Sequence, residues 1–139
     1  MKKLLLRMVI AVTVAMLFFS IPAVTQLSPV TPKAGRVQIT QGPETERVDP
    51  DFAIITWTSN NPGGSPEHDG VVRYGTDPNN LSEIAKSPIR LNPSHPYTVF
   101  RVRMPGLKPR TTYYYTVASI EANGKSDQVK SPVRHFTTP

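Results

Sequence analysis

Apolar and polar residues alternate with a period of two along much of the chain after residue 36. The clearest example is residues 97–104, in which Phe100, Val102 and Met104 alternate with two arginines. Because successive side chains of a strand point to opposite faces of a sheet, this alternation predicts half-buried β-strands. No segment of this region has the 3.6-residue apolar period of an amphipathic helix, so the sequence predicts an all-β domain.

Seven strands are expected, separated by turns rich in glycine and proline. Six of them cover residues 37–40, 52–58, 70–74, 81–85, 97–104 and 112–120, and the seventh lies around Phe136. The first is expected to end at Gly42 and Pro43, and Pro88 is expected just beyond the fourth, an edge strand. Residues 60–70, with two prolines and three glycines, are predicted to form an exposed loop.

The predicted core follows from the inward positions of these strands. A single tryptophan in the middle of a strand is typical of a core anchor, and the alternation in residues 112–117 turns two of three consecutive tyrosines inward. The predicted core residues are Trp57, Tyr74, Leu107, Tyr113, Tyr115 and Phe136.

The turn and strand of residues 106–117 resemble the corner of fibronectin type III domains that leads into their sixth strand. The resemblance rests on the spacing of Leu107, Pro109, Thr111 and Tyr113. In such corners a tyrosine bonds back to nearby backbone and fixes the turn. The resemblance implies a seven-stranded immunoglobulin-like (fibronectin type III) β-sandwich with Tyr113 as the corner residue.

Composition narrows the class of protein. The chain has 139 residues, which suits one domain, with 15 prolines, 8 glycines and no cysteine. The absence of cysteine excludes a disulfide scaffold and a zinc–cysteine site. The net charge of +6 includes Lys2, Lys3 and Arg7 near the start; the remainder has 13 basic and 10 acidic residues. This mild excess favours no nucleic-acid partner.

The first residues are similar to a secretory signal peptide. Three basic residues precede an apolar run over residues 8–19, and Ser20, Pro22 and Ala23 follow. We expect residues 1–25 to be the signal, residues 26–35 a disordered linker and residues 36–139 the domain. A secreted or periplasmic location without membrane contact after cleavage would follow, and an uncleaved anchor is the alternative.

Several short pieces of the domain resemble the N-terminal domain of purple acid phosphatases and related metallophosphoesterases. They are residues 37–42 (Val-Gln-Ile-Thr-Gln-Gly), 55–57 (Ile-Thr-Trp), 72–76 (Val-Arg-Tyr-Gly-Thr), 106–109 (Gly-Leu-Lys-Pro) with 113–115, and 136–139 (Phe-Thr-Thr-Pro). The resemblance implies a non-catalytic sandwich, because in that family a separate C-terminal domain carries the two-metal phosphatase site. The catalytic Asp-x-Gly, Gly-Asp-x-x-Tyr and Gly-Asn-His pieces are missing here.

The remaining residues suggest no other chemistry. His68, His95 and His135 are far apart in the sequence. The one local cluster, Glu67-His68-Asp69, falls in the predicted loop and is interpreted as solvated surface, with adventitious metal binding as the alternative. Neither a Gly-x-Ser-x-Gly elbow nor a glycine-rich phosphate loop is present. We therefore expect no enzyme activity, no catalytic or metal-binding residues and no cofactor.

The outer face of the sheet with the third, sixth and seventh strands is the predicted binding surface. It would carry Arg73, Tyr114 and His135, and tyrosine and arginine are common interface anchors. Arg101 and Arg103, on the other sheet, are expected to be solvated charges without an aromatic companion.

Three hypotheses of function remain. The first is an exported non-catalytic module that binds an unknown protein or glycan. The second is an accessory domain of a split or truncated metal-dependent acid phosphatase, whose partner would be a separate catalytic domain. The third is a structural spacer.

Overall fold

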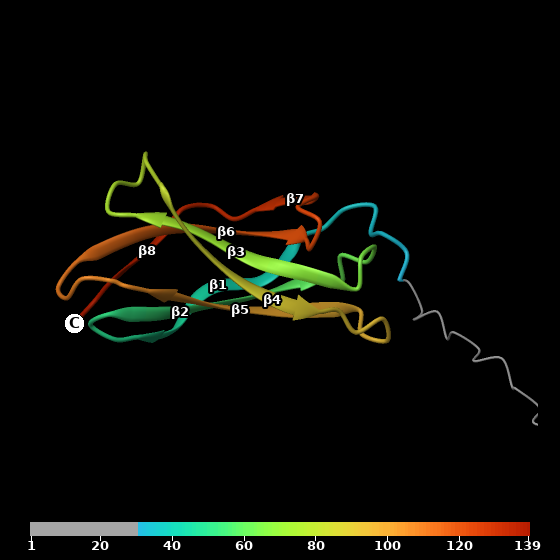
Figure 1. Ribbon diagram of the computed structural model, residues 1–139, viewed down its shortest axis with the longest axis horizontal. Coiled ribbons are helices and arrows are strands. Elements are labelled where there is room, and N and C mark those ends of the chain that lie inside the picture. The colour runs from blue at the N-terminus through green and yellow to red at the C-terminus, as the bar shows by residue number, and fades with distance from the viewer. Residues whose placement is uncertain (1–30) are drawn as a thin grey trace, which may run out of the picture.

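The computed structural model of the protein describes residues 31–139, and the predicted signal peptide lies outside them. Two antiparallel sheets face one another, and the described residues contain no helix (Figure 1). Accordingly, no helix in this range is long and apolar enough to cross a membrane. The predicted all-β, fibronectin type III-like sandwich is confirmed.

The first sheet has three strands and the second has five. In the first, the order is β1 (Ile39–Val48), β2 (Phe52–Asn60) and β5 (Tyr97–Pro105). In the second, the order is β4 (Glu83–Arg90), β3 (Glu67–Gly75), β6 (Thr112–Glu121) and β7 (Ser126–Lys130), and β8 (Arg134–Thr137) also pairs with β6.

The core lies between the sheets, on the inward positions of the alternating strands. Trp57 of β2 lies opposite Phe100 of β5, and their rings stack with centroids 5.1 Å apart. Gly70 of β3 faces this pair; a Cβ there would come within 2.9 Å of Val102 and 3.1 Å of Trp57, so only glycine leaves room for the indole. All six predicted core residues lie in this cluster of buried side chains: Trp57, Tyr74, Leu107, Tyr113, Tyr115 and Phe136.

The corner before β6 is closed by a tyrosine. The backbone N–H of Lys108 donates a hydrogen bond to the hydroxyl oxygen of Tyr113 over 3.0 Å. The ring of Tyr113 contacts Tyr74 edge to face and stacks on Phe136, with centroids 6.2 and 5.9 Å apart. One side chain thus joins the turn to β3 and β8, which pair with this part of β6.

Strand boundaries differ from the expectation in several places. β1 continues past Gly42 and Pro43 with shifts of register rather than ending there. β4 is longer than predicted and contains Pro88, opposite Asp69; an edge strand tolerates proline, which cannot donate to a ladder. The predicted last strand is divided into β7 and β8, because the hydroxyl of Ser131 accepts the N–H of Val117 over 2.9 Å and Pro132 has no N–H.

Residues 31–35, predicted to belong to a disordered linker, pack against the sandwich. The N–H of Ala34 donates to the carbonyl of Pro62 over 2.9 Å, and the N–H of Gly64 donates to that of Thr31 over 2.8 Å. Gly63 has a φ of +61°, and a Cβ there would lie 1.9 Å from the carbonyl oxygen of Pro32. The predicted boundary at Arg36 is therefore too late, because contacts with a distant loop hold this segment.

Candidate functional site

The inner face of the second sheet changes in character along β3 and β6. One end, here called the aromatic end, consists of Tyr74, Tyr113, Tyr115 and Phe136. Beyond this end, the inward positions of β6 are Val117, Ser119 and Glu121. Those of β3, in the reverse direction of the chain, are Val72, Gly70 and His68, and all six residues are buried. The aromatic core therefore gives way to buried polar groups at the other end.

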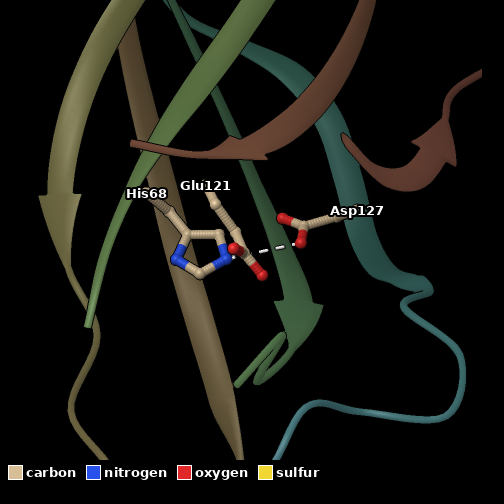
Figure 2. Close-up of side chains that lie close together, drawn as sticks. All are labelled: His68, Glu121 and Asp127. Atoms are coloured by element: carbon tan, nitrogen blue, oxygen red, sulfur yellow. Dashed lines mark ion pairs between the residues drawn. The ribbon is translucent and has the colours of Figure 1, made fainter. Parts of the chain in front are cut away.

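Four side chains form this second region, here called the polar end. His68 comes from β3, Glu121 from β6, Asp127 from β7 and Lys33 from the N-terminal segment. Ligand atoms of His68, Glu121 and Asp127 all lie within 4.8 Å of one another, and Figure 2 shows the imidazole and both carboxylates converging. The side chains of His68 and Asp127 are 0% exposed and that of Glu121 is 9% exposed, so the group is inside the protein.

Asp127 is the most heavily contacted member. The hydroxyl of Ser119 donates to its Oδ2 over 2.6 Å, Lys33 forms an ion pair with its Oδ1, and Nε2 of His68 lies 3.3 Å from the same oxygen. Burial by itself would raise the pKa of Asp127, but the contacts with His68, Lys33 and Ser119 outweigh burial and lower the pKa from its ordinary 3.8 to about 2. The carboxyl is therefore ionised at neutral pH.

Lys33 connects the two carboxylates. Its Nζ lies 3.1 Å from Oε1 of Glu121, whose other oxygen accepts a longer bond of 3.3 Å from Asn123. The bond from Lys33 is the main cause that lowers the pKa of Glu121. Burial acts to lower the pKa of Lys33, but Asp127 and Glu121 outweigh it and raise that pKa. Both partners are charged, and the ammonium bridges two negative groups.

His68 is the unusual member. Its Nε2 lies 3.3 Å from Oδ1 of Asp127, yet the two atoms do not form a hydrogen bond. Among the described residues, neither ring nitrogen has a hydrogen-bond partner although the side chain is completely buried. Such groups are rare in folded proteins, because each one loses its hydrogen bonds to water without replacement.

The sequence prediction for His68 was wrong. Glu67, His68 and Asp69 were expected in an exposed loop, but β3 begins at Glu67 and turns His68 inward. The alternation of Tyr74 and Val72, continued back through Gly70, reaches His68 and could have placed it. The proximity of His68 to Glu121 and Asp127 was missed for the same reason.

The outer face of the second sheet holds the three residues predicted to bind a partner. Tyr114 pairs with His135 of β8, and their rings lie 5.8 Å apart. Arg73 lies two residues along β3 from Gly75, the partner of Tyr114, so the two side chains are diagonal neighbours. Arg73 also pairs with Ile84 of β4, which is 45% exposed, and among residues 31–139 it forms no salt bridge. We call Arg73, Ile84, Tyr114 and His135 the outer patch.

The opposite sheet differs from its prediction. Arg101 makes two bonds to the carboxylate of Glu46, over 2.7 and 2.9 Å, and the guanidinium of Arg103 lies 4.2 Å from the centre of the Phe52 ring. Both arginines are exposed, as expected. The expectation of no aromatic companion was wrong for Arg103, because the start of β2 supplies Phe52, and Arg101 is paired with Glu46 of β1. Tyr97 and Val99 are also about half exposed on this face, at 51% and 47%.

Comparisons with known proteins agree with this architecture. The family model "Purple acid Phosphatase, N-terminal domain" matches residues 32–138. No curated protein matches the chain.

Among solved structures, one similar to this chain is the sensor domain of the anti-sigma factor RsgI4 of Pseudobacteroides cellulosolvens. A short form of that domain has a TM-score of 0.52 and 20% identity over 76% of this chain and 97% of that one. A long form has a TM-score of 0.50 and 20% identity over 73% and 88%. The FN5 domain of Drosophila Lar has a TM-score of 0.41 and 17% identity over 71% and 92%. These likenesses concern the fold alone.

Proposed function

Because the chain belongs to the family of purple acid phosphatase N-terminal domains, we propose that it is an exported, non-catalytic module that binds a protein or glycan partner. Within that family this domain is the non-catalytic one. The chain therefore contributes recognition rather than chemistry, and its binding surface has to lie on the outside of the sandwich.

The outer patch is the observation that supports this function best. The ring of Tyr114 lies beside that of His135 at a tilt, with centroids 5.8 Å apart, so contact with a partner would immobilise few additional rotamers. Arg73 offers a planar set of donors that no carboxylate among the described residues engages. Exposed Ile84 adds apolar area beside the guanidinium. An aromatic ring, free donors and an apolar side chain on one flat face suit a protein segment or the face of a sugar ring.

The opposite sheet is the weaker candidate because its charges are already paired. Arg101 donates two hydrogen bonds to the carboxylate of Glu46, and Arg103 lies over Phe52. A partner would have to replace these contacts before it gained its own. This face is nevertheless the right control, because β5 also carries an exposed tyrosine, Tyr97, together with Arg101.

Two matched double variants test the binding surface. The full chain, the variant Tyr114→Ala with Arg73→Ala, and the variant Tyr97→Ala with Arg101→Ala are compared on a glycan array and by cross-linking to proteins of the native source. Loss of an aromatic and an arginine anchor typically weakens binding by at least about tenfold. We expect that loss only for the first variant. Loss of binding only in Tyr97→Ala with Arg101→Ala would assign the binding site to the opposite sheet. If the full chain bound no ligand in either assay, the binding function would be refuted.

Export is tested separately. We expect the mature protein outside the cytoplasm to begin after a cut near Ala23 or Thr25, as determined by mass spectrometry of its N-terminal peptide. A chain recovered from the cytoplasm with Met1 and the apolar run intact would refute export. Full-length chain in the membrane fraction would instead support the uncleaved anchor.

A second candidate function is that of an accessory domain to a metallophosphoesterase catalytic domain, which the family match favours. The purified chain is assayed with a chromogenic phosphate ester and iron, zinc or manganese. We expect no turnover from the chain alone. Turnover that depends on the metal would contradict the non-catalytic assignment. An increased rate of a separately supplied catalytic domain would support the accessory role.

A further inference from the structure

The polar end has the ligand types of a metal site, and Lys33 forms ion pairs with both of its carboxylates. One imidazole and two carboxylates, from three different strands, bring their ligand atoms within 4.8 Å of one another inside the protein. The carboxylates carry two negative charges, and Lys33 supplies one positive charge. Buried charges are normally balanced by partners or by a metal ion, and a metal ion at this point would contact both carboxylates and the imidazole at once.

His68 provides an independent indication of a missing ligand. Its side chain is 0% exposed, it points at Asp127, and neither of its nitrogens has a hydrogen-bond partner among the described residues. A neutral imidazole nitrogen with a free lone pair is the commonest metal ligand in proteins. Coordination would satisfy Nε2 at the point where no side chain does so.

The spacing of the ligand atoms suits a small divalent ion. Zinc binds imidazole nitrogen and carboxylate oxygen at about 2.0 to 2.2 Å in tetrahedral geometry, which places neighbouring ligand atoms about 3.4 Å apart. Nε2 of His68 and Oδ1 of Asp127 are 3.3 Å apart. Glu121 is the third ligand after a small movement, and imidazole favours zinc or a similar transition metal over calcium or magnesium.

Lys33 occupies the position of a cation in this arrangement. It forms ion pairs with Asp127 and Glu121, but it is one-third exposed and belongs to a segment held mainly by two backbone hydrogen bonds to residues 62–64. An ammonium group can therefore leave while the strands that carry the three ligand residues stay in place. We propose that His68, Glu121 and Asp127 bind a divalent transition-metal ion such as Zn²⁺, that Lys33 competes with this ion, and that metal binding releases residues 31–35 from the sandwich.

Zinc titration of the full chain, by competition with a chromophoric chelator in phosphate-free buffer, tests this proposal. We expect one bound zinc per chain, at least about tenfold tighter binding in Lys33→Met, and at least about tenfold weaker binding in His68→Gln. Lys86→Met and His135→Gln are the matched controls, since both residues are exposed and lie away from the cluster, and they should bind zinc as the unaltered chain does. Near-ultraviolet circular dichroism of Trp57 verifies folding, and Glu121→Gln replaces His68→Gln if the latter does not fold.

Several outcomes would overturn the proposal. Absence of saturable zinc binding in both the unaltered chain and Lys33→Met would show that the cluster is not a metal site. Equal zinc affinities in these two proteins would show that Lys33 does not compete with the ion. Binding that His135→Gln abolishes and His68→Gln preserves would assign the metal to the surface.

Release of the segment has its own measurement. Trypsin cleaves after lysine and arginine, and the bond between Lys33 and Ala34 is held against the domain while Lys33 is paired. Zinc should therefore accelerate cleavage at this bond severalfold, while cleavage after exposed Arg110, in the turn before β6, stays constant. Slower cleavage after Lys33 in the presence of zinc would contradict displacement of the lysine.

Discussion

The aromatic end and the polar end are built from the same two strands, β3 and β6, yet they hold the sandwich together in different ways. At the aromatic end, Tyr113 and Tyr115 both contact Phe136, with ring centroids 5.9 Å apart in each pair. At the polar end, the same inward positions carry Glu121 and His68. Figure 1 shows the N-terminal segment approaching the end of the sandwich where β6 turns into β7.

The two ends differ in what they contribute to the stability of the domain. Burial of aromatic rings stabilises the fold by an amount that rises with the area removed from water. Buried ion pairs recover little beyond the cost of desolvating the charges, so they add specificity and sensitivity to conditions more than stability. The aromatic end should therefore determine how stable the domain is, and the polar end should determine how its stability responds to pH and ions.

Phe136→Ala should give the largest effect and tests the first half of this comparison. Phe136 is 7% exposed, lies on short β8 and contacts two tyrosines. Removal of a buried phenylalanine side chain costs about 3 to 5 kcal/mol in the free energy of unfolding, because both its transfer energy and the packing of its neighbours are lost. Chemical denaturation measures the change.

His135→Ala is the control for this prediction, because it alters the neighbouring residue on the exposed side of β8. It should shift the midpoint little, since surface substitutions are usually within about 0.5 kcal/mol. If the denaturation midpoint of Phe136→Ala shifted as little as that of His135→Ala, the aromatic end would not be the source of stability.

The aromatic end could be predicted from the sequence because its signals are local. Alternation in β6 put Tyr113 and Tyr115 inward, and the spacing from Leu107 to Tyr113 indicated the corner that the bond from Lys108 closes. The division of the last strand could not be predicted, since it depends on the hydroxyl of Ser131 meeting the backbone of Val117 across the sheet.

The polar end was missed because its members are ordinary in their local sequence. Lys33 lies among proline and glycine residues that suggest a linker, and Glu121 and Asp127 flank a hairpin where charged residues are common. Lys33 and Asp127 are 94 residues apart, so only the tertiary fold brings them together. The paired arginines of the opposite sheet were missed in the same way, because Glu46 and Phe52 come from other strands.

Asp127→Asn should give the next largest effect and tests the polar end. The pKa of Asp127 is about 2 in the folded chain, against an ordinary 3.8. The unfolded chain therefore binds a proton more readily around pH 3, and the stabilisation by the carboxylate is complete above about pH 5 and is lost as the pH falls toward 2. The shift corresponds to about 2 kcal/mol. Urea denaturation from pH 2 to 6, with a chelator present, measures this slope.

The loss in free energy of unfolding between pH 6 and pH 2 should be smaller by about 2 kcal/mol in Asp127→Asn. It should be unchanged in Asp51→Asn, which alters an exposed aspartate beside β2. An equal slope in the unaltered chain and in Asp127→Asn would show that acid sensitivity arises elsewhere. Because the chelator removes metal ions, this outcome does not depend on zinc binding.

Tyr113→Phe should give the smallest of the three effects and separates the two kinds of interaction within the aromatic end itself. The ring stays, with its contacts to Tyr74 and Phe136, and only the hydroxyl that accepts the N–H of Lys108 over 3.0 Å is lost. That N–H is partly buried and is left without its partner, which costs about 1 kcal/mol. Tyr114→Phe, one residue along β6, removes a hydroxyl on the outer face and should leave the denaturation midpoint unchanged. If both variants behaved alike, the corner hydrogen bond would add nothing to the packing of the ring, and the aromatic end would be held by its apolar contacts alone.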